Sequence, residues 1–233
     1  HPLALAAALD NAVIIGNGTG RSLNENQNSC PVVYLVVDQG ELHIYGAGRF
    51  TMGRTEVPIE LSESACAEVA ISVKSAKALQ SMLRQAPSGA DATASVVIYD
   101  EPAPTMPEDE DGDEMEPIWV DVIVSKNGKE VAALGDADPE GKWSRVVDVV
   151  DARLRAAEDV GRRRGGPLAL TVEDVNRLSS LRHKSKVIDF ANTDIECVTA
   201  FKAGPLTMGI VGEVRREKFL SLGGGTEGDL WAA

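Results

Sequence analysis

The sequence predicts an α+β fold of repeated β-α-β-β-β units, with antiparallel sheets covered by helices on one face. Residues 165–216 contain a short apolar run, an amphipathic helix pattern and three strand-like runs. A similar order of elements occurs earlier, near residues 3–61, which lack the leading strand, and near residues 67–134. Tight-turn signals at Asp38-Gln39-Gly40 and Asn127-Gly128 join successive strands, as antiparallel hairpins require.

The first unit begins with an Ala/Leu-rich segment, residues 3–15, which favours a helix. Residues 16–29 are turn formers and predict a loop. Strand-like runs follow at residues 31–37, 41–46 and 50–61. His43 alternates with apolar neighbours on the second of these runs, so we expect it to face solvent.

The second unit places a strand at residues 67–73 and a helix at residues 74–85, with Ser72 as its N-cap. Apolar residues recur at helical spacing and predict a buried face: Val73, Ala76, Leu79 and Leu83. Strands are expected at residues 93–100, 118–125 and 130–134. Between the first two lies a segment rich in proline and acid, residues 101–117, which we expect to be a disordered loop.

The third unit follows a helix pattern within residues 139–164 and a basic, glycine-flanked linker at 162–164. Residues 168–171 are expected to form its first strand, and Thr171 to cap a helix with an acidic first turn. The predicted apolar face of that helix holds Val172, Val175, Leu178 and Leu181. Strand-like runs follow at residues 187–191, 195–202 and 206–214. We therefore expect a first domain at 1–136, a second with one evident half at 137–216, and a flexible tail at 217–233.

Composition narrows the classes of function. With 43% hydrophobic residues the chain can bury a core, and with 4% aromatics that core is aliphatic. A net charge of −13 argues against a protein that coats nucleic acid by bulk charge. Residues 142–186 nevertheless hold eleven Lys/Arg against six Asp/Glu, which suits local contact with a polyanion.

Three widely spaced cysteines suggest neither a disulfide framework nor a zinc site, and we expect a cytoplasmic protein. No apolar run of membrane-spanning length occurs, and the apolar opening segment lacks the basic region of a signal peptide. The histidines do not cluster, and no nucleophile or paired-carboxylate motif is evident. We expect no enzymatic activity, catalytic residues, metal or cofactor.

Three stretches resemble the DNA sliding clamp family, the bacterial DNA polymerase III beta subunit, and particularly its shortened actinobacterial and phage forms. Residues 31–50 (PVVYLVVDQGELHIYGAGRF) are similar to a strand–turn–strand segment of the clamp. Residues 67–84 (AEVAISVKSAKALQSMLR) resemble the strand and helix that begin a second half-domain. Residues 141–151, 167–181 and 209–215 resemble the late helix and C-terminal segments, although the Met-Pro pair of that terminus is missing.

The resemblance implies a homo-oligomeric ring around duplex DNA, with helices facing the DNA and sequence-independent phosphate contacts. The positions that match these contacts are basic residues: Lys74, Lys77, Arg84, Arg177, Arg182, Lys184 and Lys186. An ordinary solvated helix face explains them equally well. The resemblance also implies an apolar groove for peptides of a DNA polymerase or other replication proteins, at Ile210, Val211, Val214 and Arg215. Core strand packing is the alternative interpretation of those four.

Two other functions remain open. A clamp-fold accessory protein would bind a replication partner without encircling DNA. A nucleotide-binding enzyme would use residues 16–22, which imitate a phosphate loop but are one residue short and carry Arg in place of Lys. Residues 109–113 resemble a calcium loop with its glycine misplaced, and a solvated acidic loop explains them better.

Overall fold

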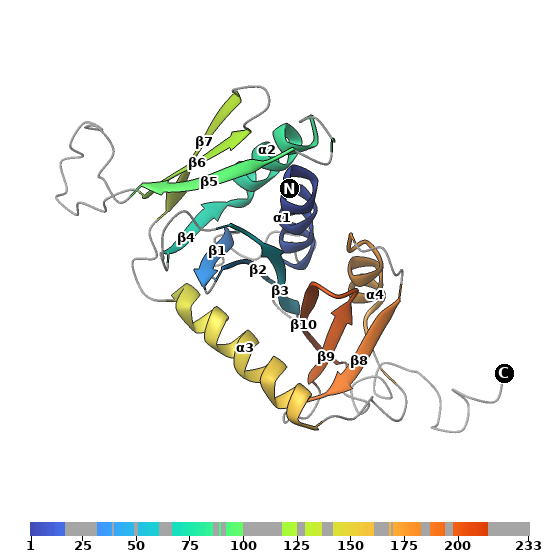
Figure 1. Cartoon of the computed structure of the whole chain (residues 1–233). Helices are drawn as coiled ribbons and strands as arrows, with labels where there is room; N and C mark the ends of the chain where they lie inside the picture. The colour runs from blue at the N-terminus through green and yellow to red at the C-terminus, as the bar shows by residue number, and fades with distance from the viewer. Residues whose placement is uncertain are drawn as a thin grey trace, which may run out of the picture.

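Ten strands form a single antiparallel sheet in a computed structural model of the chain, in the order β5-β6-β7-β4-β1-β2-β3-β10-β9-β8 (Figure 1). The structure describes residues 1–16, 32–38, 40–48, 51–60, 67–85, 89, 92–99, 118–124, 129–136, 142–160, 168, 170–182, 187–193 and 198–213. The predicted α+β class with antiparallel strands is confirmed.

The elements follow the predicted order. The first unit consists of α1 (Pro2–Gly16), β1 (Val32–Asp38), β2 (Glu41–Ala47) and β3 (Thr51–Pro58). The second consists of β4 (Ala67–Ser72), α2 (Val73–Arg84), β5 (Ala94–Tyr99), β6 (Ile118–Val124) and β7 (Lys129–Asp136). After α3 (Lys142–Val160) come α4 (Val172–Ser179), β8 (Ile188–Asn192), β9 (Val198–Ala203) and β10 (Thr207–Gly212).

Helices α1 and α2 lie together on one face of the sheet and bury a continuous aliphatic core against it. Inward-facing residues of β1, β2 and β4, such as Val33, Ile44 and Ile71, pack against Leu9 of α1 and Leu79 of α2. Side chains alternate between the two faces of a strand, so every second residue reaches this core. The α1–α2 pair thus forms the helical layer of the first two units.

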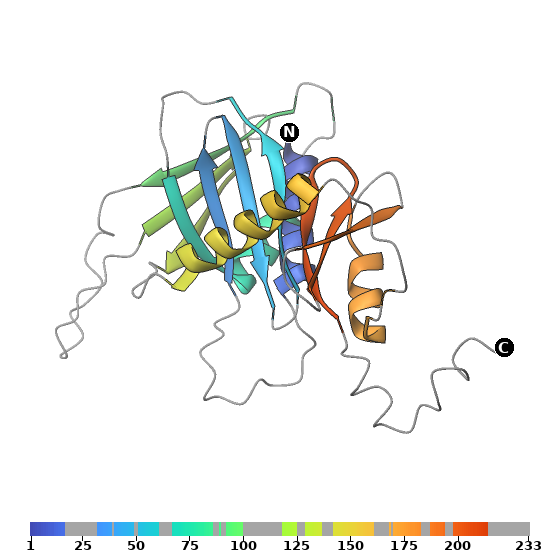
Figure 2. The same ribbon diagram turned by 90° about the horizontal axis from the view of Figure 1, so that it is seen from below.

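Helix α3 lies on the opposite face, where it crosses the strands diagonally (Figure 2). Its Val150 and Leu154 pack against Tyr34, Tyr45 and Met208, which point away from α1. The helices of the predicted units lie on one face as expected, since α4 packs beside Ile15 of α1, and α3, which belongs to none of those units, covers the other face. The reason is that this face carries its own apolar residues, and an amphipathic helix buries its apolar side wherever such a surface is available.

The third unit extends the sheet, because β10 pairs with β3 of the first unit. Gly209 and Gly53 face each other in this register, and a Cβ on Gly209 would lie 2.3 Å from the Met52 carbonyl oxygen. Leu168, Leu170 and Thr171 are not in a strand, so the predicted first strand of this unit is wrong. Leu170 instead packs against the core beneath α4, which shows that the apolar run serves burial without strand pairing.

The predicted cap of α4 is confirmed, whereas half of its predicted apolar face is wrong. Thr171 Oγ1 accepts the Asp174 amide at 3.1 Å. Leu178 and Leu181 are buried, but Val172 is 76% exposed. Val175 is also exposed. Asp174, at 3% exposure, lies on the buried face of the helix, because it has hydrogen-bonding partners there. Ser72 caps α2 in the same way as Thr171 caps α4, accepting the Ser75 amide at 3.1 Å.

Several predictions lie outside the described residues: the loop predicted at residues 16–29, except for Gly16, which ends α1, the acidic segment 101–117, the basic linker 162–164 and the tail 217–233. The division into domains at residue 136 also stays a prediction. Within the described helices, none combines the length and apolar character needed to span a membrane.

Candidate nucleic-acid interface

Helix α2 presents a basic surface on the face of the sheet that α1 and α2 cover. Lys74, Lys77 and Arg84 are exposed, and the helix contains no acidic residue. Its buried face is held by Val73, Ala76, Leu79 and Leu83, as predicted, and this places the basic side chains on the remaining surface. Among the described residues, neither lysine has an ion-pair partner. Their ammonium groups are therefore available to an external anion.

An acidic side chain of α1 joins two of the predicted basic residues. Asp10 Oδ2 accepts from Arg84 Nη2 at 2.7 Å and from Arg182 Nε at 2.9 Å. Asp10 is the one charged side chain in the sequence of α1. A single carboxylate between two guanidinium groups leaves one positive charge in excess, so this junction is also net basic.

Arg177 differs from Lys74, Lys77, Arg84 and Arg182 because it is largely buried. Its Nη1 donates to Asp174 Oδ1 at 3.0 Å and to Thr51 Oγ1 at 2.9 Å. Thr51 belongs to β3, so these bonds attach α4 to the sheet. This side chain has structural partners inside the chain. Lys184 and Lys186 lie outside the described residues.

The predicted partner groove falls on β10, between β3 and β9. Ile210 is buried on the face of α3, and Val211, at 0% exposure, is buried on the face of α1 and α4. Both therefore take part in core packing. Val214 and Arg215 lie just beyond the described end of β10.

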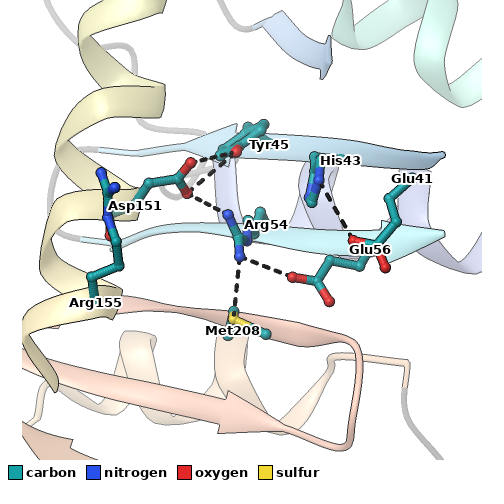
Figure 3. Close-up of polar contacts among 8 residues, drawn as sticks. All are labelled: Glu41, His43, Tyr45, Arg54, Glu56, Asp151, Arg155 and Met208. Atoms are coloured by element: carbon teal, nitrogen blue, oxygen red, sulfur yellow. Dashed lines mark hydrogen bonds and ion pairs between the residues drawn. The ribbon is translucent and has the colours of Figure 1, made fainter. Parts of the chain in front are cut away.

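The sequence did not indicate a polar network beneath α3, shown in Figure 3. Arg54 Nη1 donates to Asp151 Oδ1 at 2.6 Å, and Arg54 Nη2 donates to Glu56 Oε1 at 2.9 Å. Tyr45 Oη donates to Asp151 Oδ2 at 3.0 Å, and burial raises the pKa of this phenol above its ordinary value. Alternation of Tyr45 with buried Ile44 was the only sequence signal, since Asp151 is distant in the chain.

His43 of β2 lies next to this network. Glu41 is two residues away on the same strand, and Glu56 lies opposite His43 on β3. The His43 side chain is 13% exposed, so the expectation that it faces solvent is wrong. It lies on the face of Tyr45, with ring centroids 6.4 Å apart, on a side of the sheet that the network and α3 partly cover.

No protein-family model matches the sequence, and no curated protein matches it. Solved structures do match the fold. A putative DNA polymerase III beta subunit from Eubacterium rectale aligns with a TM-score of 0.58 at 8% identity, covering 93% of this chain and 64% of that one. The DNA polymerase sliding clamp from Pseudomonas aeruginosa aligns with a TM-score of 0.57 at 10% identity, covering 95% and 65%.

A third match is the DNA polymerase III beta subunit from Thermotoga maritima. It aligns with a TM-score of 0.55 at 14% identity, covering 91% of this chain and 64% of that one. The chain thus spans less than two thirds of each of these three clamp subunits. At such low identities the likeness concerns the arrangement of helices and strands. The chain has the fold of the bacterial DNA polymerase III beta sliding clamps.

Proposed function

We propose that the chain is a non-enzymatic processivity factor of sliding-clamp type, which encircles duplex DNA and tethers replication proteins to it. The fold supports this proposal, because the structures that match it are of DNA polymerase sliding clamps and beta subunits. A protein bound to such a ring would gain effective concentration at the DNA without a tight contact of its own.

The observation that carries the proposal is the exposed basic surface of α2. Lys74, Lys77 and Arg84 project from a helix without acids, although the chain as a whole has a net charge of −13. Phosphate contacts from lysine and arginine are independent of sequence and are screened by salt. Weak contacts of this kind would permit sliding. Arg182 adds to this surface beside Arg84, whereas buried Arg177 would support α4.

We propose that more than one copy of the chain forms the ring. The described sheet ends at β5 on one side and at β8 on the other. Edge strands carry unpaired backbone donors and acceptors that can pair with another chain. We propose that β5 of one copy pairs with β8 of the next, which would continue the sheet around the ring.

We place the site for replication partners near the end of β10. Ile210 and Val211 would form the packed floor of this site, and Val214 and Arg215, beyond the described strand, would contact the peptide. An extended peptide would find affinity in backbone bonds and specificity in side-chain pockets.

Light scattering with multi-angle detection tests the ring directly. We expect a concentration-independent oligomer whose mass is a small integer multiple of 24.7 kDa. A monomer at micromolar concentration would contradict encirclement. That result would favour the alternative of a clamp-fold accessory protein, which binds a partner and needs no closed ring.

A further inference from the structure

Two strands bring a histidine and two glutamates to one patch of the sheet, on the side of α3. Glu41 and His43 are two residues apart on β2, so they share a face, and Glu56 lies directly opposite His43 on β3. Figure 3 shows the three side chains together beside Arg54. The strand register alone therefore assembles this set, with no contribution from a loop.

The ligand atoms of these residues all lie within 4.8 Å of one another. His43 Nε2 and Glu41 Oε2 are 3.7 Å apart, which is too long for a hydrogen bond. Two ligand atoms bound to one tetrahedral ion are about 3.4 Å apart, given metal–ligand distances of about 2.1 Å. Metal binding would require side-chain rotation to shorten this distance and the longer separations of up to 4.8 Å, and the half-exposed side chain of Glu41 has room to rotate.

The imidazole of His43 is mostly buried, with 13% of its side chain exposed, and it makes no hydrogen bond within the described part of the chain. Its Nδ1 has no partner in the described part of the chain, and its Nε2 makes only the long contact with Glu41. Buried polar groups are nearly always paired, and an unpaired one calls for an explanation such as an ion. A ligand role for Nε2 would use the nitrogen that faces Glu41, and Nδ1 would then carry the proton of the ring.

The charges around the patch suit a divalent cation. Glu41 and Glu56 contribute two negative charges, while Arg54 and Asp151 offset each other across their 2.6 Å ion pair. Arg54 also holds Glu56 Oε1 at 2.9 Å and leaves the other carboxylate oxygen for a ligand bond. Such outer contacts orient metal-binding carboxylates in known metal sites.

We propose that Glu41, His43 and Glu56 bind a divalent transition-metal ion, with Zn²⁺ as the ion to test. Imidazole nitrogen with carboxylate oxygen is a ligand set of zinc, whereas magnesium and calcium prefer oxygen alone. Three protein ligands leave a fourth position for water, which can enter past exposed Glu41. The ion would join β2 to β3 on the face away from α2, so this site is independent of the proposed DNA contact.

Calorimetric titration of the metal-free full chain with Zn²⁺ tests the site. The background should be His1→Ala, because the imidazole of His1 lies outside the proposed site and can bind zinc by itself. We expect about one ion per chain, with affinity at least tenfold weaker in both His43→Gln and Glu41→Gln. Because Glu41 is exposed, its variant should keep the fold, which circular dichroism verifies. Asp189→Asn, an exposed carboxylate on β8, is the matched control and should bind as the background does.

Substitution of Co²⁺ for Zn²⁺ distinguishes this site from the three cysteines. Nitrogen and oxygen ligands should produce weak visible bands without the thiolate charge-transfer band in the near ultraviolet. The proposal is overturned if no ion binds, if the thiolate band appears, or if His43→Gln and Glu41→Gln bind as the background does.

Discussion

At the scale of single residues, Asp174 explains why the apolar pattern of α4 wrongly predicted that Val172 and Val175 are buried. It accepts hydrogen bonds from Thr51, Thr171 and Arg177, and it is 3% exposed. A buried carboxylate is tolerated only when it is paired and hydrogen-bonded. This small network holds α4 against β3 and turns the helix so that Val172 and Val175 face outward.

Asp174→Ala should lower the free energy of unfolding by about 3 kcal/mol, because it leaves the largely buried Arg177 without its counter-charge. Urea denaturation followed by circular dichroism measures this. Glu173→Ala is the control, since Glu173 is exposed in the same turn and its loss should cost only about 0.5 kcal/mol. Equal midpoints for the two variants would show that the network contributes little.

Gly46 permits α1 to lie directly on β2. A Cβ at this position would be 2.0 Å from the Ala12 carbonyl oxygen, a backbone atom that moves only with the helix. Gly46→Ala should therefore destabilise the chain by about 3 kcal/mol, seen as a lower melting temperature. At Gly16 the nearest atom would be 3.4 Å away. Gly16→Ala should leave the melting temperature close to that of the parent, and a similar loss in both would refute the close-packing argument.

At the scale of elements, α3 connects strands of different units. It contacts β3 together with β8, β9 and β10, and so bridges the junction at which the third unit joins the first. Apolar packing by Val150 and Leu154 is supplemented by the bonds of Asp151 to Tyr45 and Arg54. Asp151 therefore adds a polar attachment to the apolar contacts that Val150 and Leu154 make with the sheet.

Asp151→Ala should weaken the attachment of α3 by about 2 kcal/mol, the scale of hydrogen bonds to a charged group. Amide hydrogen exchange within residues 142–160 should then accelerate by at least tenfold, while exchange in α1 changes little. Asp148→Ala removes an exposed carboxylate from the same helix and should leave exchange unchanged. Unaltered exchange in Asp151→Ala would indicate that apolar packing alone positions α3.

At the scale of the whole molecule, the two faces of the sheet differ in what they expose. The face covered by α1 and α2 carries the basic residues of α2 and the Asp10 junction. The opposite face carries α3 and the Glu41–His43–Glu56 patch. If the proposed function holds, duplex DNA should contact only the face covered by α1 and α2. Lysines on the two faces then provide an internal comparison.

Replacing Lys74 and Lys77 with alanine should weaken binding to duplex DNA and reduce the slope of log affinity against log salt by about 2, or about 1 for each lost phosphate contact. Fluorescence anisotropy at several salt concentrations measures both quantities. Lys202→Ala removes an exposed lysine from β9 on the α3 face and should change neither. An equal effect of Lys202→Ala would contradict a DNA contact specific to the face covered by α1 and α2.

Local patterns predicted much of this fold. The caps at Ser72 and Thr171 follow from short-range hydrogen bonding, and the exposure of Lys74 and Lys77 follows from the apolar spacing of α2. The burial of Arg177 could not be predicted, because its partner Thr51 is 126 residues away. The prediction that His43 faces solvent was wrong for a similar reason. Strand alternation assigns residues to two faces, but it does not indicate that α3 lies on one of these faces.

The order of helices and strands and their antiparallel turns follow from the sequence alone, because these depend on neighbours within a few residues. The tertiary structure decided three things: the pairing of β10 with β3, the face on which α3 lies, and the meeting of Glu41 and His43 with Glu56. Each of these depends on contacts between distant segments, and their geometry arises only when the strands pair and their register is set.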